Sequence, residues 1–200
     1  MVPFKFIPPA VPVLRATPPA GEGWLHEVKF DGWRAQLHKV GHESVVLSKN
    51  GHDISARCRP VVKEASEISA RSVIVDGELV VLDAEGRPDF AAIGRRGASA
   101  TLWAFDLLEL NGSDLRTKPL LERRRRLQGL LPKALEHIRF SESFADPVAL
   151  LTVLESMTIE GIVSKRGEAP YRSGTRCGWV KVKTASWRRE HAERWRQFVK

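Results

Sequence analysis

Five short segments of this sequence place charged or aromatic side chains within runs that are otherwise apolar. A charge in an apolar strand is costly unless it is paired or bound to an ion, so each segment is a candidate for binding or catalysis. The segments cover residues 26–34, 73–83, 103–106, 159–165 and 179–183.

The first segment carries an amine between two carboxylates. In an extended strand alternate side chains share one face, so Glu27, Lys29 and Asp31 are expected to lie together. Val28 and Phe30 would then face the core. This row is unusual for a plain solvent face, although a ladder of surface salt bridges has the same pattern.

The second and fifth segments carry pairs of like charges. Asp76 and Glu78 stand among β-branched residues, either in a buried strand or in a local turn at the Asp-Gly step. Lys181 and Lys183 share a strand face, where they repel each other unless an anion lies between them. An exposed edge strand, which often carries lysine, is the alternative for these two residues.

Short strands must hold these segments in place. Alternation of apolar and polar residues predicts strands over 24–30, 34–40, 44–48, 73–82, 101–108, 161–165 and 178–183. Helical spacing and capping predict helices over 117–131, 148–157 and 187–199. Strands mixed with few helices predict an α+β domain built on antiparallel sheets.

The composition favours a polyanionic partner. With 42% hydrophobic residues the chain of 200 residues can bury a core, and its formal charge is +8. Such an excess favours nucleic acid, a nucleotide or an anionic membrane, unless the protein is merely basic. Cys58 and Cys177 do not form a CxxC pair, which argues against a zinc site. No apolar run reaches the roughly 18 residues of a membrane span, so we expect no membrane association.

Taken in order, the segments resemble the motif set of the covalent nucleotidyltransferases, specifically the ATP-dependent DNA ligases. Residues 29–34 match the signature KxDGxR, and residues 119–124 are similar to a segment of bacterial repair ligases. At Lys49 the ligases usually have arginine. The remaining matches are residues 48–51, 76–78, 105–108, 160–165 and 181–183.

The resemblance implies a domain organisation. It predicts an α+β, ATP-grasp-like nucleotidyltransferase domain of antiparallel sheets flanked by helices over residues 24–183. A Pro-rich lead-in, 1–23, precedes the domain, and a basic amphipathic helix, 184–200, follows it. Ligases of this family normally continue into an OB-fold domain, for which 184–200 is too short. We therefore expect no OB-fold domain here. The chain would then be a minimal ligase domain, a fragment, or a protein that uses a separate OB-fold protein.

The resemblance also implies a reaction and its residues. Lys29 would attack ATP to form lysyl-AMP, the AMP would pass to the 5′-phosphate of a DNA nick, and the nick would be sealed in repair or recombination. The expected catalytic residues are Lys29, Asp31, Arg34, Lys181 and Lys183. The expected ATP-binding residues are Glu27, Lys29, Arg34, Lys49, Glu78, Phe105, Lys165, Lys181 and Lys183. Glu160 and Glu78 would hold Mg²⁺, and the expected DNA-binding residues are Arg34, Lys49, Arg188 and Arg189.

Two roles and the competing functions complete the prediction. By resemblance Phe105 stacks on adenine and Glu27 contacts its amino edge. The expected partners are ATP, nicked double-stranded DNA and other repair proteins, in the cytoplasm and specifically the bacterial nucleoid. The alternatives are an RNA ligase or capping-type nucleotidyltransferase, and a non-catalytic DNA-binding relative that shares the fold.

Overall fold

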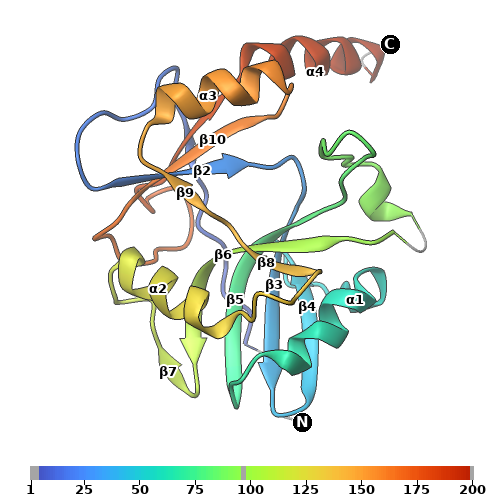
Figure 1. The fold of residues 1–200 in the computed structure, drawn as a ribbon, viewed down its shortest axis with the longest axis vertical. Helices are drawn as coiled ribbons and strands as arrows, with labels where there is room; N and C mark the ends of the chain where they lie inside the picture. Colours follow the sequence, from blue (N-terminus) through green and yellow to red (C-terminus); the bar gives the residue numbers. More distant parts are fainter. Residues whose placement is uncertain (1–4, 96–97, 199–200) are drawn as a thin grey trace.

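A computed structural model shows two β-sheets, one above the other in the view of Figure 1. It describes residues 5–95 and 98–198, and for 193–198 only the backbone. One sheet has five strands and lies in the upper half of Figure 1, beneath helices α3 and α4. The other has six strands and lies below it, against α1 and α2.

The five-stranded sheet joins segments from both ends of the chain. Its strand order is β1-β11-β10-β2-β9, with antiparallel pairing except between β1 and β11. Apolar residues of one face pack with α3, because every second residue points to that side. The strands are β1 (Val13–Leu14), β2 (Trp24–Lys29), β9 (Ser143–Phe144), β10 (Gly161–Arg166) and β11 (Val180–Lys183).

The six-stranded sheet carries the main hydrophobic core on its outer face. Its order is β4-β3-β5-β6-β7, and β8 pairs in parallel with β6. Leu37, Val75 and Leu102 are fully or almost fully buried there, with Val61 of α1 and Leu127 of α2. The strands are β3 (Trp33–Val40), β4 (Glu43–Ser48), β5 (Ser72–Val80), β6 (Thr101–Leu110), β7 (Ser113–Asp114) and β8 (Ile138–Phe140).

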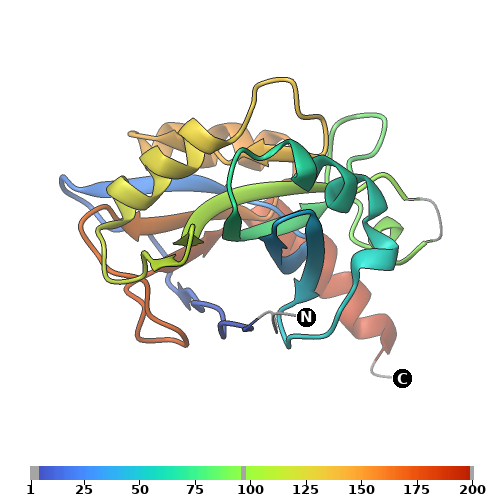
Figure 2. The same cartoon turned by 90° about the horizontal axis from the view of Figure 1, so that it is seen from below.

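The helices cover the sheets from outside. In Figure 2, α2 and α3 lie on one side of the strands and the lead-in lies on the opposite side. Among the described residues, no helix is long and apolar enough to cross a membrane. The helices are α1 (Arg59–Glu64), α2 (Leu120–Leu130), α3 (Pro147–Ser156) and α4 (Ala185–Phe198), with 3₁₀ turns at Ser55–Arg57, Ala65–Glu67 and Ala92–Gly94.

Most of the predicted elements are present. All seven predicted strands and the three helices exist, with ends shifted by up to three residues. Asp146 caps α3 as expected, by accepting hydrogen bonds from two backbone amides of its first turn. The end of the last predicted helix at Val199 lies outside the described residues. Strands β1, β7, β8 and β9 and helix α1 were not predicted, because elements this short carry little periodicity.

The lead-in is held to the domain by buried polar contacts. Gln36 of β3 donates to the backbone oxygen of Ile7 at 2.6 Å, and its side-chain oxygen lies 3.2 Å from Nε2 of His38. Both side chains are almost fully buried. Burial lowers the pKa of His38 to about 4, although the charge of Asp76 opposes the change. The hydrogen bonds between Gln36 and Ile7 therefore hold the described part of the lead-in against β3.

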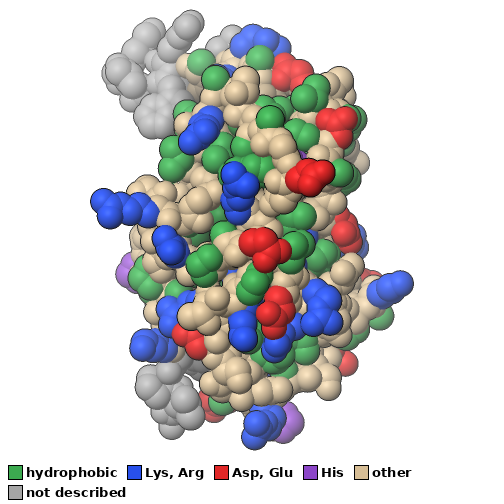
Figure 3. Space-filling view, turned by 90° about the vertical axis from the view of Figure 1, so that its left-hand side faces the viewer, with side chains coloured by type: hydrophobic (Ala, Val, Ile, Leu, Met, Phe, Trp, Pro, Cys, Tyr) green, Lys and Arg blue, Asp and Glu red, His purple; other side chains and the backbone are tan. Residues whose placement is uncertain are grey.

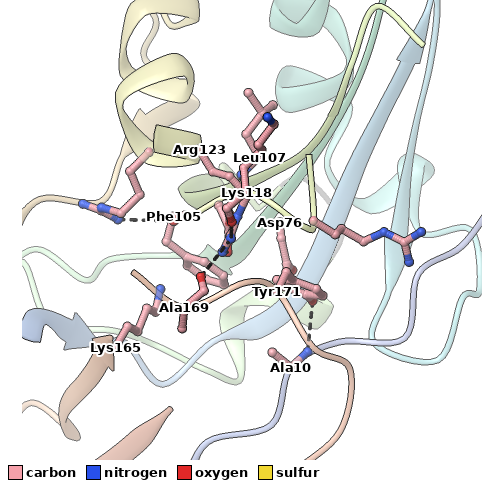
Figure 4. Close-up of polar contacts among 12 residues, drawn as sticks. Ala10, Asp76, Phe105, Leu107, Lys118, Arg123, Lys165, Ala169 and Tyr171 are labelled. Atoms are coloured by element: carbon pink, nitrogen blue, oxygen red, sulfur yellow. Dashed lines mark hydrogen bonds and ion pairs between the residues drawn. The ribbon is translucent and has the colours of Figure 1, made fainter. Parts of the chain in front are cut away.

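A buried ion pair ties α2 to the six-stranded sheet. The Arg123 guanidinium donates to both carboxylate oxygens of Asp106, at 2.7 and 2.8 Å, and neither side chain is exposed beyond 1%. Figure 4 shows Arg123 also reaching Lys118 and Ala169, whose backbone oxygens accept from it at 2.5 and 3.2 Å. Burial raises the pKa of Asp106, and Arg123 works against this rise. Breaking such a pair leaves an uncompensated buried charge.

Replacing His38 by glutamine should flatten the loss of stability in acid. The folded pKa of His38 lies below its unfolded value, so the unfolded state binds more protons between about pH 6.5 and 4. As the pH falls through this window, the free energy of unfolding of the parent should fall relative to that of His38→Gln, by on the order of 3 kcal/mol. Urea unfolding at several pH values measures the difference. Parallel curves, as expected for the exposed control His42→Gln, would contradict this account.

Removing Arg123 should destabilise the fold strongly. Arg123→Met should lower the free energy of unfolding by about 3–5 kcal/mol, because Asp106 stays buried without its partner. The double variant Arg123→Met/Asp106→Leu should recover much of the loss in urea unfolding. Exposed Arg125 on the same helix is the matched control, with an expected effect of Arg125→Met within about 0.5 kcal/mol. A loss for Arg123→Met no larger than for Arg125→Met would refute the role of the pair.

Candidate active site

A cavity of about 340 Å³ opens between the two sheets. Amines, carboxylates and aromatic rings from both sheets line it, together with Pro12 of the lead-in. Nine of its lining residues come from the predicted motifs and carry the chemistry considered below: Glu27, Lys29, Arg34, Lys49, Glu78, Phe105, Lys165, Trp179 and Lys181.

The register of the five-stranded sheet sets the order of the charges. Lys29 pairs with Gly161, and Gly161 pairs with Lys183 on the next strand. In the neighbouring row of the same face, Glu27 and Lys181 flank Val163. Val163 has a short apolar side chain and Gly161 has none, so the amines of β2 and β11, the two strands that flank β10, can reach toward each other.

Two glycines allow the backbones to approach closely at this end of the cleft. A Cβ atom on Gly161 would lie 2.0 Å from the backbone oxygen of Val182, and the φ of Gly161 is +147°. A Cβ atom on Gly32 would lie 2.3 Å from the backbone oxygen of Leu79. Glycine is therefore required by space at both positions, and at Gly161 also by backbone conformation.

A carboxylate joins two of the lysines. Glu160 is 4% exposed, and its two oxygens lie 2.5 Å from Nζ of Lys29 and 3.0 Å from Nζ of Lys183. Lys183 also packs on the ring of Trp187 at 3.9 Å, and it does not line the cavity. Lys181 does line it, and burial together with the charges of Lys29 and Lys183 lowers the pKa of Lys181. The lysine cluster thus has more positive charge than Glu160 alone neutralises.

Glu78 supplies a second carboxylate near Lys29. Burial raises the pKa of Glu78 to about 7, while Lys29 and Arg34 oppose the rise and the charge of Glu160 adds to it. The described residues form no cluster of three side chains able to hold a metal ion. Mg²⁺ commonly binds through one or two carboxylates, waters and substrate phosphates, so the pair of Glu78 and Glu160 is a donor set that fits it.

Aromatic rings and a buried acid form the other end of the cavity. Phe105 and Trp179 meet edge to face at 5.9 Å, and the amine of Lys165 lies over both rings at 4.0 and 4.3 Å (Figure 4 shows Lys165 beside Phe105). Lys165 also donates to Glu27 at 2.8 Å. Burial lowers the pKa of Lys165 to about 8, and Glu27 opposes the change. Glu27 itself is 2% exposed.

Arg34 is held in the cavity wall by Asp76. Its guanidinium donates to both oxygens of Asp76 at 2.7 Å and lies 4.6 Å from the centre of the Phe105 ring. Tyr171 completes the group by donating its hydroxyl to Asp76 at 2.7 Å and accepting from the Ala10 amide, the contact marked in Figure 4. Burial disfavours the charged form of Arg34, but Asp76 outweighs this effect and raises its pKa. Asp76 therefore belongs to a buried strand, not to a turn.

Asp31 does not share the face of Glu27 and Lys29, and that expectation is wrong. Strand β2 ends at Lys29, so the alternation stops before Asp31. The Asp31 carboxylate instead lies 3.3 Å from Nε2 of His191 on α4. It lines a neighbouring cavity of about 450 Å³ between α4 and the loop around Phe90, outside the cavity that contains Lys29.

Of the four residues expected to meet DNA, Arg34 is held in the cavity wall by Asp76, and the other three are exposed. Lys49 is exposed at the cavity rim, and Arg188 and Arg189 are exposed on α4, where Arg189 lies 3.5 Å from Glu155. On the face seen in Figure 3, acidic and basic side chains are interspersed, without a single-sign patch. Of the amphipathic helix expected over 184–200, the structure describes side chains only as far as Ala192.

Sequence reasoning missed three residues that support the site. Arg124 is 5% exposed and donates to Glu27 at 2.8 Å, although it was not among the expected site residues. Tyr171 and Ser141 also contact motif carboxylates. Only Arg124 had a signal in the sequence: four consecutive arginines on a helix cannot all face solvent, since each residue turns by about 100°.

Comparison with known proteins identifies one family. Residues 14–183 match the family described as "ATP dependent DNA ligase domain". The multifunctional non-homologous end joining protein LigD of Pseudomonas aeruginosa is 38% identical over 186 residues. The match covers 90% of this chain but 22% of that protein, so the chain spans about a fifth of this relative.

Solved structures agree in fold. The ligase domain from M. tuberculosis LigD superposes with a TM-score of 0.75 at 30% identity, over 90% of this chain and 61% of that one. A mycobacterial DNA ligase D complexed with ATP and MES superposes with a TM-score of 0.70 at 27% identity, over 86% of this chain and 60% of that one. The α+β fold of stacked antiparallel sheets is thereby confirmed.

Proposed function

The chain belongs to the ATP dependent DNA ligase domain family, and from this premise we propose that it catalyses nucleotidyl transfer from ATP to Lys29 and onward to DNA. The lysine amine attacks the α-phosphorus of ATP, a nitrogen–phosphorus bond forms, and the bond to pyrophosphate breaks. The AMP then passes to the 5′-phosphate of a nick, from which the 3′-hydroxyl displaces it. Such a substrate would locate the protein with the chromosome in the cytoplasm.

One observation carries this proposal: Lys29 ends a strand inside a cavity that is cationic at one side and aromatic at the other. Lys29 and Lys181 lie at the cationic side, where an anion relieves their mutual repulsion. Phe105 and Trp103 line the same cavity. Its volume of about 340 Å³ lies in the range of small-ligand sites. A nucleoside triphosphate fits both sides of the cavity, because its phosphates would lie beside the lysines and its base beside the aromatic rings.

The carboxylate of Glu160 supports the nucleophile in this scheme. An ammonium cannot attack, so Lys29 must lose a proton before the nitrogen–phosphorus bond forms. A carboxylate oxygen of Glu160 lies 2.5 Å from Nζ of Lys29, close enough to accept this proton. Lys181 stabilises the negative charge that develops on the phosphate oxygens. Lys183 acts more remotely, by holding Glu160.

We assign the metal site to Glu160 and Glu78, which would hold Mg²⁺ together with the phosphates. When bound there, Mg²⁺ neutralises phosphate charge and orients the reacting groups. Glu78 carries an elevated pKa in the metal-free protein, so a nearby cation would favour its ionised form. For the later steps we propose Lys49, Arg188 and Arg189 as contacts to the DNA backbone, since exposed basic side chains provide most such contacts.

Covalent labelling tests the nucleophile. Incubation with Mg²⁺ and ATP labelled at the α-phosphate should label the protein, and ATP labelled at the γ-phosphate should not, because pyrophosphate leaves. Lys29→Ala and Lys29→Arg should both abolish the label, since guanidinium stays charged. The exposed Lys133→Arg is a matched control and should label as the parent does. Undiminished labelling of either Lys29 variant would reject the assignment.

A magnesium titration tests the metal site. Glu160→Gln should slow labelling by roughly tenfold or more and raise the Mg²⁺ concentration needed for half-maximal rate, because a hard oxygen ligand is lost. Exposed Glu142→Gln serves as control and should behave as the parent. If the titrations of Glu160→Gln and the parent superimpose after scaling, Glu160 acts only through its lysine partners.

A further inference from the structure

We infer that Arg124 is a positioning residue for base selection: it holds the carboxylate of Glu27 in the orientation with which the site accepts adenine and rejects guanine. This inference rests on the proposed function, because it concerns the same ATP site. Arg124 does not line the cavity and acts on the base only through Glu27 and Phe105.

One guanidinium joins three separate segments at the aromatic end of the cavity. Nη1 of Arg124 donates to Oε1 of Glu27 at 2.8 Å and to the backbone oxygen of Phe105 at 3.2 Å. Nη2 donates to the backbone oxygen of Ser141 at 2.7 Å. The guanidinium carbon also lies 4.6 Å from the centre of the Phe140 ring. The planar fork thus fixes Glu27 of one sheet relative to Phe105 of the other.

Glu27 has no freedom to turn away. Its Oε1 accepts from Arg124, and its Oε2 accepts from Lys165 at 2.8 Å and from the hydroxyl of Ser141 at 3.4 Å. A carboxylate offers about four acceptor positions, so one remains for a ligand.

The remaining acceptor position selects the base. At C6, adenine has an amino group, which donates to a carboxylate. Guanine has a carbonyl oxygen at the same position, which the carboxylate repels. A site built around such a hydrogen bond discriminates strongly against analogues that lack it, because its own polar group stays unpaired. Without Arg124, Glu27 keeps the hydrogen bonds from Lys165 and Ser141, and its carboxylate can rotate.

Lys165 and Arg124 have different tasks in this arrangement. Lys165 lines the cavity and lies over the Phe105 ring, so its replacement would change contacts with the nucleotide itself. Arg124 lies behind the acid, so its replacement changes the base-recognising end and leaves the lysine end around Lys29 intact. The inference therefore predicts an effect on nucleotide choice without a matching effect on the chemical step.

Three triphosphates test the inference: ATP, GTP, and purine riboside triphosphate, which lacks the amino group alone. The parent should bind ATP at least about tenfold more tightly than either analogue, the scale of one hydrogen bond to a charged group. Arg124→Met should reduce this preference to within about threefold. At saturating ATP its adenylation rate should stay within about threefold of the parent. Arg124→Lys, which keeps the charge but lacks the fork, should fall between them, and Arg125→Met should match the parent.

A double variant separates positioning from folding. Arg124→Met/Glu27→Gln leaves no unpaired carboxylate and should show no further loss of preference beyond Glu27→Gln, since both changes act on one interaction. If Arg124→Met labels well but keeps the parent's nucleotide preference, or loses rate and preference equally, the role of Arg124 is overturned and the proposed function stands. A parent that neither binds these nucleotides nor becomes labelled overturns both.

Discussion

Buried pairing of arginine with carboxylate is the interaction on which the rest of the structure depends. Three such pairs, Arg34–Asp76, Arg123–Asp106 and Arg124–Glu27, surround the cleft. Arg34 and Arg123 each donate to both oxygens of their carboxylate, and Arg124 donates to one oxygen of Glu27 and to two backbone oxygens, so the pairs fix positions as well as neutralise charge. Apolar contacts alone could pack the two sheets against each other. They could not stabilise a cavity lined by charged side chains, because buried charges need partners of opposite charge.

The functional end of the cleft follows from strand alternation combined with this pairing. Alternation sends Val180 and Val182 to the core beneath α3 and Lys181 to the cavity. Register then aligns Lys29 and Lys183 on either side of Gly161, with Glu160 between their amines. The cavity is preorganised, because its charges are set by backbone pairing before any ligand arrives.

Periodicity predicted the parts of this arrangement that depend on local geometry. The strands that carry Lys29, Phe105 and Lys181 could be read from alternation, since a two-residue period needs no knowledge of the partner strand. Asp31 was misplaced because the alternation was continued past the end of the predicted strand 24–30, into an Asp-Gly step that favours a turn. The burial of Arg123 and Arg124 was missed for another reason: charge predicts exposure, and only the tertiary fold supplies the carboxylates that reverse it.

The central claim is that this cavity directs AMP to one amine among several that lie close together. Lys29, Lys165 and Lys181 all line it, so the site of modification discriminates between this account and a generally reactive lysine cluster. The direct measurement is tandem mass spectrometry of the intact-chain adduct after incubation with ATP and Mg²⁺, with fragments mapped to individual lysines. The account predicts a single AMP, on Lys29. AMP on Lys181 or Lys165, or spread over several lysines, would contradict it.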